Sequence, residues 1–446
     1  MDFSAIFKAY DVRGLYPSQI NKEVVRRIAE AYAVVRQPKK IALGQDVRSS
    51  GDELKKALME GLVQCGVDVV DIGIITTDQL YFALGQYGYD GGISVTASHN
   101  PGEYNGLKFA EAGGAPIASE NLLAIRDWAA SANKAGADGQ GKTSTKEILN
   151  DYVEHVLTYI DVGAIKPFKV LANANFGAVG RGVDKIANKL GLSIETLNWQ
   201  EDGTFPKGPP NPLLPENRDE TISRIKALKP DLGVAWDADA DRVFMFTGDG
   251  EFIPSCYIIA LLSQAFLKQL PGAKIVHDIT TAWVVDDMVS EAGGQSITNR
   301  TGHTFMKARM RKEDAVFAGE SSGHYYFKDS FYADNGIVPF LMVLQMMSKS
   351  GKTLKELVGP LMDKYKVSGE INFKVDDPPK AIELIESKFG HEGQVDKTDG
   401  LAVSSSKWRF SVRPSNTEPL FRLNAEAYNQ QDLYTLVRDI SVLINT

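Results

Sequence analysis

Three stretches of the chain begin alike, with a lysine followed by a run of apolar residues. They start at Lys40 (KIAL), Lys169 (KVLA) and Lys274 (KIVH), and each pattern predicts a buried strand. In every case a polar or small-residue loop, a stretch with helical periodicity, a glycine and another β-rich run come next. This order predicts a βαβ unit that occurs three times. The glycines are Gly66, Gly191 and Gly293.

The repeated unit also predicts the fold class. Right-handed βαβ crossovers build parallel or mixed sheets with helices on both faces, and ligands usually lie at the carboxyl ends of the strands. The segment from about Val367 differs, because it has apolar runs and an amphipathic pattern around Leu433 to Ile444 that predicts a C-terminal helix. We therefore expect three similar mixed-sheet α/β domains and a smaller C-terminal α+β domain. The expected domains are residues 1–150, 151–253, 254–366 and 367–446.

A later strand in each repeat is followed by an unusual loop. The loops are Ser98-His-Asn-Pro after GGISVTA, Asp237-Ala-Asp-Ala-Asp-Arg after DLGVAW, and Gly319-Glu-Ser-Ser-Gly-His after DAVFA. Any one of them alone is compatible with an ordinary turn. Three such loops at equivalent positions indicate a shared functional site instead.

Composition and charge narrow the class of protein. The chain has 446 residues, 43% of them hydrophobic and 24% charged, which is enough apolar material for several packed cores. Its net charge of −8 offers no general field for nucleic acid, so an anionic ligand needs a local cluster of donors. Cys65 and Cys256 are too few for a disulfide framework. With no signal peptide or membrane-spanning run in the pattern, we expect an unanchored cytoplasmic protein.

The second loop places three aspartates on alternate positions. Asp237, Asp239 and Asp241 can converge from one side of an extended backbone, and a hard divalent cation such as magnesium would offset their repulsion. A calcium EF-hand is excluded, because the sixth position is Arg242 rather than glycine and the twelfth is Gly248 rather than glutamate. An exposed acidic turn is the remaining alternative. Arg242 can contact a phosphate at the same place.

The first loop contains a possible nucleophile. Ser98 ends a strand and is followed by His99, but a serine at this position also suits a cap or turn. Lys108 begins the next apolar run and could point back toward the same site, although for this residue taken alone a solvated lysine is the favoured interpretation.

The remaining loops carry groups that suit a polyhydroxylated, phosphorylated ligand. Glu320 is followed within four residues by two hydroxyls and His324, and His303 lies in a similar glycine-flanked loop. A carboxylate that caps a nearby helix is the alternative for Glu320. Near the C-terminus, a guanidinium, two hydroxyls and an amide can wrap a phosphate, with an ordinary turn as the competitor. Those four residues are Arg413, Ser415, Asn416 and Thr417.

Five motifs in this order resemble the α-D-phosphohexomutase superfamily, most closely its phosphomannomutase/phosphoglucomutase branch. They are Tyr10-Asp-Val-Arg-Gly, Thr96 to Pro101, Asp237 to Arg242, Gly319 to His324, and Arg413 to Pro419, and they span the whole chain. The resemblance implies a heart-shaped, four-domain enzyme with a central cleft to which each domain contributes one loop. It implies an intramolecular phosphotransferase that interconverts hexose 1-phosphate and hexose 6-phosphate of mannose, glucose or both. The expected intermediate is a hexose 1,6-bisphosphate, which would also be the activator.

The resemblance also assigns roles to residues. Ser98 would carry the phosphate and, together with the three aspartates, bind one Mg²⁺ per chain. The other implied catalytic residues are Arg13, His99, Lys108 and Arg242, with Lys108 a candidate for proton transfer. The implied substrate-binding residues are His303, Glu320, Ser322, His324, Arg413, Ser415, Asn416 and Thr417. The implied partners are small hexose phosphates, with no nucleic acid or membrane, and the chain would be a monomer or dimer.

Two departures from the family pattern stand out. Ala238 and Ala240 occupy positions where the family usually has glycines, and the segment after Asp278 lacks a basic residue that many phosphomannomutases have two positions later. One substrate contact is therefore in doubt. Phosphoglucosamine mutase is the alternative enzyme, but its usual N-terminal Gly-Thr-Asp-Gly and its glutamine in the sugar loop are replaced here by Tyr10-Asp-Val-Arg and Ser321. A non-catalytic sugar-phosphate binding protein is the alternative outside the enzymes.

Overall fold

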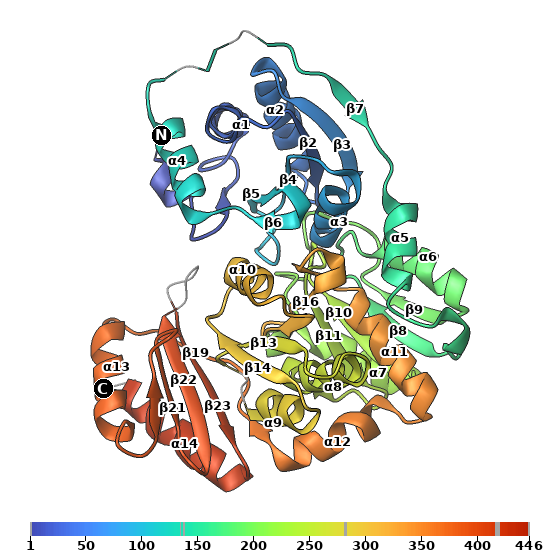
Figure 1. Cartoon of the computed structure of the whole chain (residues 1–446), viewed down its shortest axis with the longest axis vertical. Helices are drawn as coiled ribbons and strands as arrows, with labels where there is room; N and C mark the ends of the chain where they lie inside the picture. The colour runs from blue at the N-terminus through green and yellow to red at the C-terminus, as the bar shows by residue number, and fades with distance from the viewer. Residues whose placement is uncertain (1, 134, 137–138, 281–282, 415–419, 445–446) are drawn as a thin grey trace. The chain divides into compact units, whose positions relative to one another are not determined.

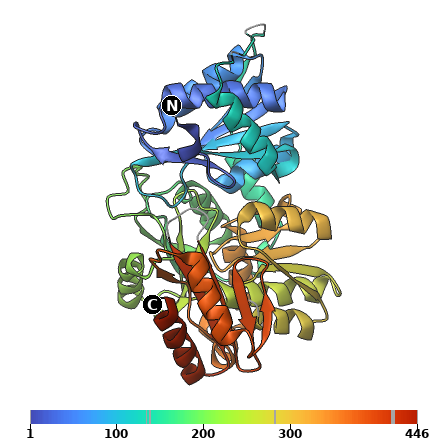
Figure 2. The same ribbon diagram turned by 90° about the vertical axis from the view of Figure 1, so that its left-hand side faces the viewer.

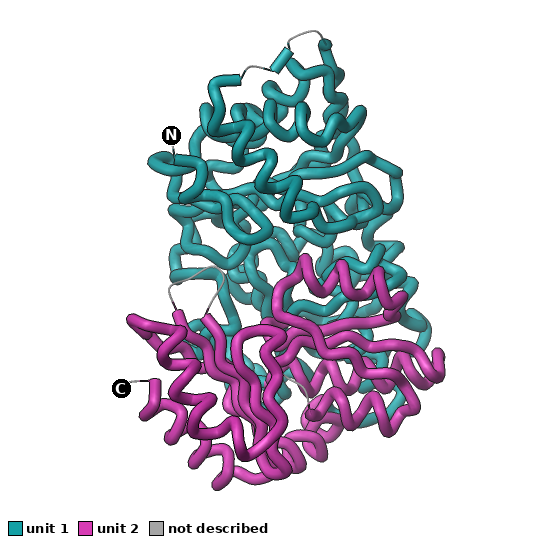
Figure 3. Tube along the Cα trace, turned by 60° about the vertical axis from the view of Figure 1, so that its left-hand side comes forward, with its two compact units in different colours: residues 1–252, 324–353 teal, residues 253–323, 354–446 magenta. Residues whose placement is uncertain are grey.

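The computed structural model describes residues 2–133, 135–136, 139–280, 283–414 and 420–444. The chain divides into two compact units, one made of residues 1–252 and 324–353 and the other of residues 253–323 and 354–446 (Figure 3). Each unit has hydrophobic clusters of its own. Among the described helices, none combines the length and the apolar character that crossing a membrane requires.

The N-terminal part of the first unit is a mixed sheet with helices on both faces (Figure 1). Its strand order is β1-β5-β4-β2-β3-β7, in which β5 is antiparallel to both of its neighbours and the other pairs are parallel. Ile41 and Leu43 of β2 pack in one cluster with α1, α2 and α4, whereas Ala42 packs in another with α3. Because alternate side chains enter two cores, the strand is apolar throughout. The elements are β1 (Val12–Leu15), α1 (Lys22–Arg36), β2 (Lys40–Gln45), α2 (Gly51–Gln64), β3 (Asp68–Ile74), α3 (Thr77–Tyr87), β4 (Gly91–Val95), β5 (Tyr104–Glu111), α4 (Ser119–Ala130) and β7 (Thr143–Thr145).

The rest of the first unit contains a second sheet of the same kind. Its order is β12-β11-β10-β8-β9, with β12 at Phe252–Ile253, and in it β8 has a parallel neighbour on each side and β11 is antiparallel to β10. Helix α6 ends at Gly191, whose φ of 65° is a left-handed conformation that glycine adopts without strain, as the sequence predicted for a helix stop. The elements are α5 (Leu149–Leu157), β8 (Lys169–Asn173), α6 (Gly180–Leu190), β9 (Ser193–Leu197), α7 (Asp219–Leu228), β10 (Leu232–Trp236), β11 (Val243–Thr247), β16 (Tyr325–Phe327), β17 (Ala333–Asp334) and α11 (Val338–Ser350).

The second unit combines a third parallel arrangement with an antiparallel C-terminal sheet. Strand β13 has β14 and β15 as parallel neighbours. The C-terminal sheet has the order β18-β23-β22-β21-β20, and α13 and α14 cover one of its faces (Figure 2). The elements are α8 (Ser255–Gln269), β13 (Lys274–Asp278), α9 (Trp283–Glu291), β14 (Gln295–Asn299), α10 (His303–Glu313), β15 (Phe317–Gly319), α12 (Leu354–Lys364), β18 (Lys366–Val367), β19 (Ile371–Phe373), α13 (Pro378–Phe389), β20 (Gln394–Asp396), β21 (Leu401–Ser404), β22 (Trp408–Pro414), β23 (Phe421–Ala427) and α14 (Gln430–Ile444).

The threefold repeat predicted from the sequence is confirmed. The three strands that begin with lysine are β2, β8 and β13, and each lies between two parallel strands. The three unusual loops follow the equivalent strands β4, β10 and β15. The predicted fold class of three mixed α/β sheets and a separate C-terminal α+β part is therefore correct, and the loops lie at carboxyl ends of strands, where a ligand site is expected.

Gly106 of β5 gives a direct test of this packing. A Cβ at this position would lie 2.0 Å from the carbonyl oxygen of Val12 in β1 and 2.9 Å from that of Thr96. Because both obstacles are backbone atoms, we predict that Gly106→Ala destabilises the protein by about 1–3 kcal/mol, the usual cost of overpacking. Thermal unfolding followed by circular dichroism should show a lower Tm.

Gly182 of α6 is the matched control for this substitution. Outside its own helix and chain neighbours, the Cβ it would gain meets only Cδ1 of Leu149, at an ordinary contact distance of 3.9 Å. Because alanine is favoured over glycine inside a helix by about 0.5–1 kcal/mol, Gly182→Ala should leave the Tm unchanged or raise it. A Gly106→Ala protein that melts like the wild type would show that the approach of β1 to β5 does not require glycine.

Candidate active site

Ser98 lies in a tight turn after β4. It is buried, and its φ of 51° is unusual for a residue other than glycine. Its backbone N–H donates to Oγ1 of Thr96 at 2.9 Å, and its Oγ lies 3.2 Å from Oδ2 of Asp237 and 3.3 Å from Nδ1 of His99. The structure therefore brings the predicted nucleophile next to the first predicted metal ligand. A strained backbone that persists in such a turn must be held by its surroundings.

Arg48 stabilises the Ser98 turn through hydrogen bonds to backbone oxygens. Its guanidinium is completely buried and donates to the carbonyl oxygens of Ser98 (2.7 Å), Asn100 (2.6 Å), Pro101 (2.6 Å) and Tyr104 (2.8 Å). A planar group with five N–H donors is suited to several acceptors at once. This one side chain therefore binds carbonyl oxygens at both ends of the segment from Ser98 to Tyr104.

Asp46 completes the support of this loop. Its Oδ2 pairs with Nε of Arg48 at 3.2 Å and accepts a 2.6 Å hydrogen bond from Oγ1 of Thr96. Thr96 in turn accepts from the N–H of Ser98. A continuous chain of polar contacts thus runs from a buried ion pair to the backbone of Ser98.

The three aspartates of the second loop converge, as their alternation predicted. Asp237, Asp239 and Asp241 are buried, and one potential ligand atom from each lies within 4.8 Å of the others. Burial, followed by the charges of Asp241 and Asp239, raises the pKa of Asp237 well above its usual value. Burial and the charge of Asp239 also raise the pKa of Asp241. Concentrated negative charge in a site closed to water is an arrangement that a cation relieves.

Lys108 and Arg242 bring positive charge to the triad. Nζ of Lys108, on β5, lies 2.7 Å from Oδ2 of Asp239 and 2.5 Å from Oδ2 of Asp241. Burial alone would lower the pKa of Lys108, but these two carboxylates raise it well above its usual value, so the ammonium stays protonated. Nε of Arg242 donates to Oδ2 of Asp237 at 3.0 Å. The interpretation of Lys108 as a solvated lysine is wrong.

The donor set of the triad fits a divalent cation. Asp239 Oδ1 and Asp241 Oδ1 are buried, and neither has a hydrogen-bond partner among the residues that the structure describes. Carboxylate oxygens are the ligands that hard cations prefer, and an unpartnered buried carboxylate oxygen is costly without one. The exposed acidic turn considered from the sequence is excluded by the burial of all three side chains.

The two alanines of this loop differ in conformation. Ala240 has a φ of 51°, which explains why glycine suits this position, whereas Ala238 is not among the residues with positive φ. Two glycines of neighbouring segments touch the loop backbone, because a Cβ on Gly177 would lie 2.4 Å from the Ala238 oxygen and one on Gly336 2.3 Å from the Ala240 oxygen. The loop keeps its three convergent carboxylates despite both alanines.

Three further predicted residues, Arg13, His99 and His324, lie in the first unit. Arg13 of β1 pairs with Asp11 at 2.8 Å and donates to Oδ1 of Asn100 in the Ser98 loop at 2.6 Å. His99 contacts a guanidinium nitrogen of Arg242.

His324 also belongs to this unit and lies at the acidic cluster. Its Nδ1 is 3.1 Å from Oδ2 of Asp334 and 3.9 Å from Oδ1 of Asp241. The structure therefore brings it together with the loop of the three aspartates.

The other predicted residues lie in the second unit. Oε1 of Glu320 accepts a 2.6 Å hydrogen bond from the N–H of Gly302, the residue directly before α10, whose first residue is His303. This contact lies at the N-terminus of a neighbouring helix, so it agrees with the helix cap considered for Glu320. Oδ2 of Asp399 accepts from the N–H of Thr301 at 3.0 Å and lies 3.6 Å from Nε of Arg413. Arg413 is thus linked through one carboxylate to the Thr-Gly-His loop.

The loop from Gly319 to His324 has an additional anchor in this unit. Ser321 donates to Oδ2 of Asp278 through its N–H (3.0 Å) and its hydroxyl (2.8 Å), and its Oγ lies 2.5 Å from Oγ1 of Thr280. Thr280 occupies the position where the basic residue was expected, and its hydroxyl serves the loop. Ser322 is partly exposed. Ser415, Asn416 and Thr417 lie outside the described residues.

Sequence reasoning missed Arg48, Thr77 and Asp334, which contact candidate residues from distant segments. Thr77 donates to Asp239, and Asp334 lies beside His324. A signal was present for two of them, because Arg48 and Thr77 come directly after the parallel strands β2 and β3, at the ends where functional loops gather.

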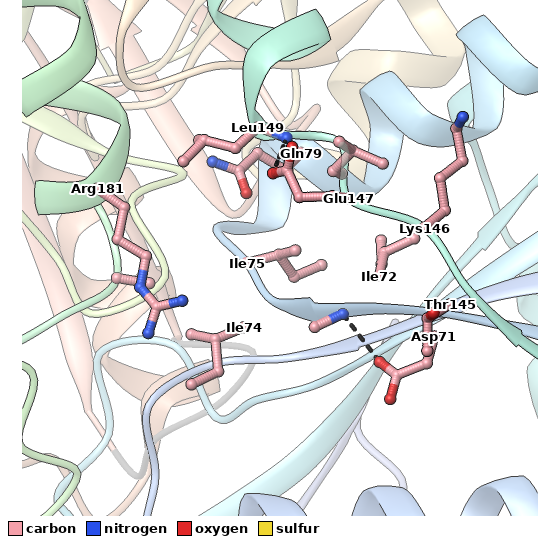
Figure 4. A pocket seen from close by; sticks show the side chains of 13 residues that line it. Asp71, Ile72, Ile74, Ile75, Gln79, Thr145, Lys146, Glu147, Leu149 and Arg181 are labelled. Atoms are coloured by element: carbon pink, nitrogen blue, oxygen red, sulfur yellow. Dashed lines mark hydrogen bonds between the residues drawn. The ribbon is translucent and has the colours of Figure 1, made fainter.

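A separate cavity of about 350 Å³ lies in the first unit (Figure 4). Its lining residues come from the end of β3, the start of α3, the segment 145–149 and the start of α6, and include Ile74, Ile75, Gln79 and Arg181. Among the described residues that line it, none is a predicted site residue.

The sequence matches four family models over nearly its whole length. They are described as phosphoglucomutase/phosphomannomutase alpha/beta/alpha domain I (residues 4–135), domain II (150–250), domain III (254–365) and C-terminal domain (370–441).

Similar proteins carry related names. Phosphohexose mutases of Xanthomonas campestris pv. campestris are 42% identical over 441 residues, 98% of both chains. A phosphomannomutase of Escherichia coli K12 is 44% identical over 430 residues, 94% of both chains. A crystal structure of a phosphoglucomutase/phosphomannomutase family protein from Burkholderia thailandensis superposes with a TM-score of 0.88 at 31% identity, over 99% of this chain and 97% of that one.

Arg48 provides the test of how the Ser98 turn is held. A lysine offers three donors and no planar fork, so in Arg48→Lys at least one of the four carbonyl oxygens loses its partner. Each buried oxygen left unpaired costs about 1–3 kcal/mol. We predict a lower Tm and at least a tenfold lower kcat in a coupled mutase assay. Arg36→Lys, in the partly exposed pair of Arg36 with Glu111, is the control and should behave like the wild type. An Arg48→Lys enzyme with full kcat would contradict this role.

Proposed function

The chain belongs to the phosphoglucomutase/phosphomannomutase family, and on this premise we propose that it interconverts hexose 1-phosphates and hexose 6-phosphates of mannose and glucose through a phosphorylated Ser98. The family membership rests on the four matched models and on relatives of 42–44% identity over nearly the full chain. The position of Ser98 Oγ, 3.2 Å from a carboxylate of the buried acidic triad, is the observation that carries the proposed mechanism.

The proposed reaction moves one phosphoryl group at a time. A sugar hydroxyl oxygen bonds to the phosphorus of phosphoserine while the bond from phosphorus to Ser98 Oγ breaks, which gives a hexose 1,6-bisphosphate. The hydroxyl proton leaves with the attack, and Ser98 Oγ gains a proton. The bisphosphate then returns its other phosphoryl group to Ser98 and leaves as the isomeric monophosphate. It would also prime an unphosphorylated enzyme, as an activator.

Charge and positioning account for most of the catalysis in phosphoryl transfer. Arg242 and Lys108 supply fixed positive charge beside Ser98 and the triad. Lys108, whose ammonium pairs with Asp239 and Asp241 of the triad, would be the proton donor to the departing serine oxygen. Arg13, tied to Asn100 of the same loop, and His99, beside Ser98 Oγ, would position the phosphoserine.

Magnesium is the cation that we propose for the triad, one per chain. Asp237, Asp239, Asp241 and the phosphorylated Ser98 would hold it through oxygen atoms, which is the donor chemistry that magnesium selects. The bound ion would stabilise the negative charge that develops on the transferred group. A second group of potential ligands, Asp241, His324 and Asp334, shares one member with the triad and includes a nitrogen, which suits magnesium less well.

Sugar and distal phosphate would be bound by the remaining loops. Carboxylate, hydroxyl and imidazole groups suit sugar hydroxyls, and the C-terminal loop suits the phosphate that does not react. The bisphosphate must present either end to Ser98, so the distal loop has to accept both orientations. The proposed contacts are His303, Glu320, Ser322, His324, Arg413, Ser415, Asn416 and Thr417.

We further propose four domains with boundaries near residues 150, 254 and 367, each contributing one loop. The four separate family matches support this division. Hinged motion of the fourth domain would let the intermediate turn. The location would be cytoplasmic, and the active form a monomer or dimer.

The sugar preference tests the proposed function. Mannose and glucose phosphates differ only at the 2-hydroxyl, and one hydrogen bond there contributes about 1 kcal/mol, less than tenfold in preference. We predict turnover of both mannose 1-phosphate and glucose 1-phosphate, with any imbalance toward mannose, and much poorer turnover of glucosamine 1-phosphate. Comparing kcat/KM under identical magnesium and bisphosphate decides this. A glucosamine value above the other two would favour the alternative, phosphoglucosamine mutase.

Ser98→Ala tests the phosphoenzyme. Removing the nucleophile should lower turnover by about 10⁴-fold or more while leaving the Tm near that of the wild type. Incubation with ³²P-labelled glucose 1,6-bisphosphate should label the wild type and leave Ser98→Ala unlabelled. Ser263→Ala, whose hydroxyl bonds only within α8 among the described residues, is the control and should label normally. A Ser98→Ala variant that retained a tenth of wild-type turnover would overturn the assignment. If the protein is a non-catalytic binding protein, neither the wild type nor Ser98→Ala should be labelled.

A further inference from the structure

The first residue of α3 is bonded to the metal loop. The backbone N–H of Thr77 donates to the carbonyl oxygen of Asp239 at 2.8 Å, and its Oγ1 donates to Oδ2 of the same aspartate at 2.6 Å. Both residues are buried, and 162 positions separate them in the sequence. One threonine therefore fixes both the backbone and the carboxylate of Asp239.

The two carboxylate oxygens of Asp239 differ in their hydrogen-bond partners. Oδ2 accepts from Thr77 and, at 2.7 Å, from Nζ of Lys108. Oδ1 is buried and has no hydrogen-bond partner among the residues that the structure describes. Because Oδ2 is held, the position of the unpartnered Oδ1 is fixed as well. Asp239 has a potential ligand atom within 4.8 Å of those of the other two aspartates.

A carboxylate held on one oxygen differs from one held on neither. The terminal torsion of aspartate is broad and nearly two-fold, so without a second contact the group can rotate and exchange its oxygens. Lys108 restrains it with a single point charge shared with Asp241, whereas the Thr77 hydroxyl adds a directional bond to Asp239 alone. The orientation of the unpartnered oxygen therefore depends on Thr77.

We infer that Thr77 is a positioning residue for the divalent cation, which holds Oδ2 of Asp239 so that Oδ1 is presented to the metal. This inference rests on the proposed function of the triad as the magnesium site. It adds a residue of α3, outside the five sequence motifs that carry the family resemblance. Outer-sphere partners of metal ligands typically change metal affinity by about 10–100-fold when removed.

Direct binding of Mn²⁺ tests the inference without relying on activity. The full-length, dephosphorylated protein is titrated with Mn²⁺ alone, and free Mn²⁺ is measured by electron paramagnetic resonance. Thr77→Val removes the hydroxyl but keeps the backbone N–H and the branched shape, and should weaken Mn²⁺ binding by about tenfold. Thr77→Ser restores the hydroxyl and should bind Mn²⁺ within about threefold of the wild type. In mutase assays, the half-saturating Mg²⁺ concentration should rise for Thr77→Val, and kcat should recover at saturating Mg²⁺.

Thr76→Val is the matched control. Thr76 is also buried and directly precedes Thr77, but its hydroxyl donates to Asp78 and not to the triad. It should bind Mn²⁺ like the wild type. If Thr77→Val does not fold, the comparison of Thr77→Ala with Thr77→Ser replaces it, with the same expected difference.

The outcomes separate this inference from the proposed function. A folded Thr77→Val protein with wild-type Mn²⁺ affinity overturns the role of Thr77 and leaves the metal site intact. Equal weakening in Thr76→Val and Thr77→Val also overturns it, because the effect would then be one of local packing. A wild-type protein that binds no Mn²⁺ refutes the metal site itself.

Discussion

Three carboxylates placed out of water within a few ångströms of one another repel strongly, and their neighbours are arranged to hold them there. Asp237, Asp239 and Asp241 are buried at 2% exposure or less. Lys108 reaches two of them from the preceding sheet, across 131 and 133 residues of sequence. Removing one partner of such a buried group leaves an uncompensated charge, which is strongly destabilising. The first and second sheets of the first unit are therefore joined by the same contacts that build the site.

The backbone at the site is strained in a way that fits this constraint. Ser98 and Ala240 both have a φ of 51°, and they lie in the two loops that the charges bring together. Such conformations cost about 1–3 kcal/mol each and persist only where the surroundings over-determine them. Arg48 supplies that restraint under Ser98, and close contact with Gly336 supplies it at Ala240. Arg48 and Gly336, which restrain these two strained residues, are not among the proposed catalytic or binding residues.

The sequence was sufficient for the repeat, the three loops and the acidic triad. Those features are local, because a buried strand is an apolar run and a functional loop interrupts it with polar residues. Arg48 and Thr77 were not predicted, because each resembles an ordinary residue at a strand end or helix start. Their importance comes from hydrogen bonds to partners 50 or more residues away in the sequence. The same limit applied to Lys108, whose burial between two aspartates could not be read from its neighbours in sequence.

The three repeats also share a way of fixing their loops. At the end of the central strand in the first repeat, Asp46 accepts from Thr96 and so holds the Ser98 loop. In the second, Asn175 donates to the carbonyl oxygen of Trp236 at 2.6 Å, directly before the loop of the three aspartates. In the third, Oγ1 of Thr280 lies 2.5 Å from Oγ of Ser321, in the loop that follows β15.

Each of these three residues comes six positions after the lysine that begins the strand between two parallel neighbours (40 to 46, 169 to 175 and 274 to 280), so each lies just beyond the carboxyl end of that strand. A polar side chain there satisfies the adjacent loop at short range. The architecture thus supplies a polar anchor at the same place three times, and the residues that follow β4, β10 and β15 decide whether the anchored loop carries Ser98, three carboxylates or Glu320.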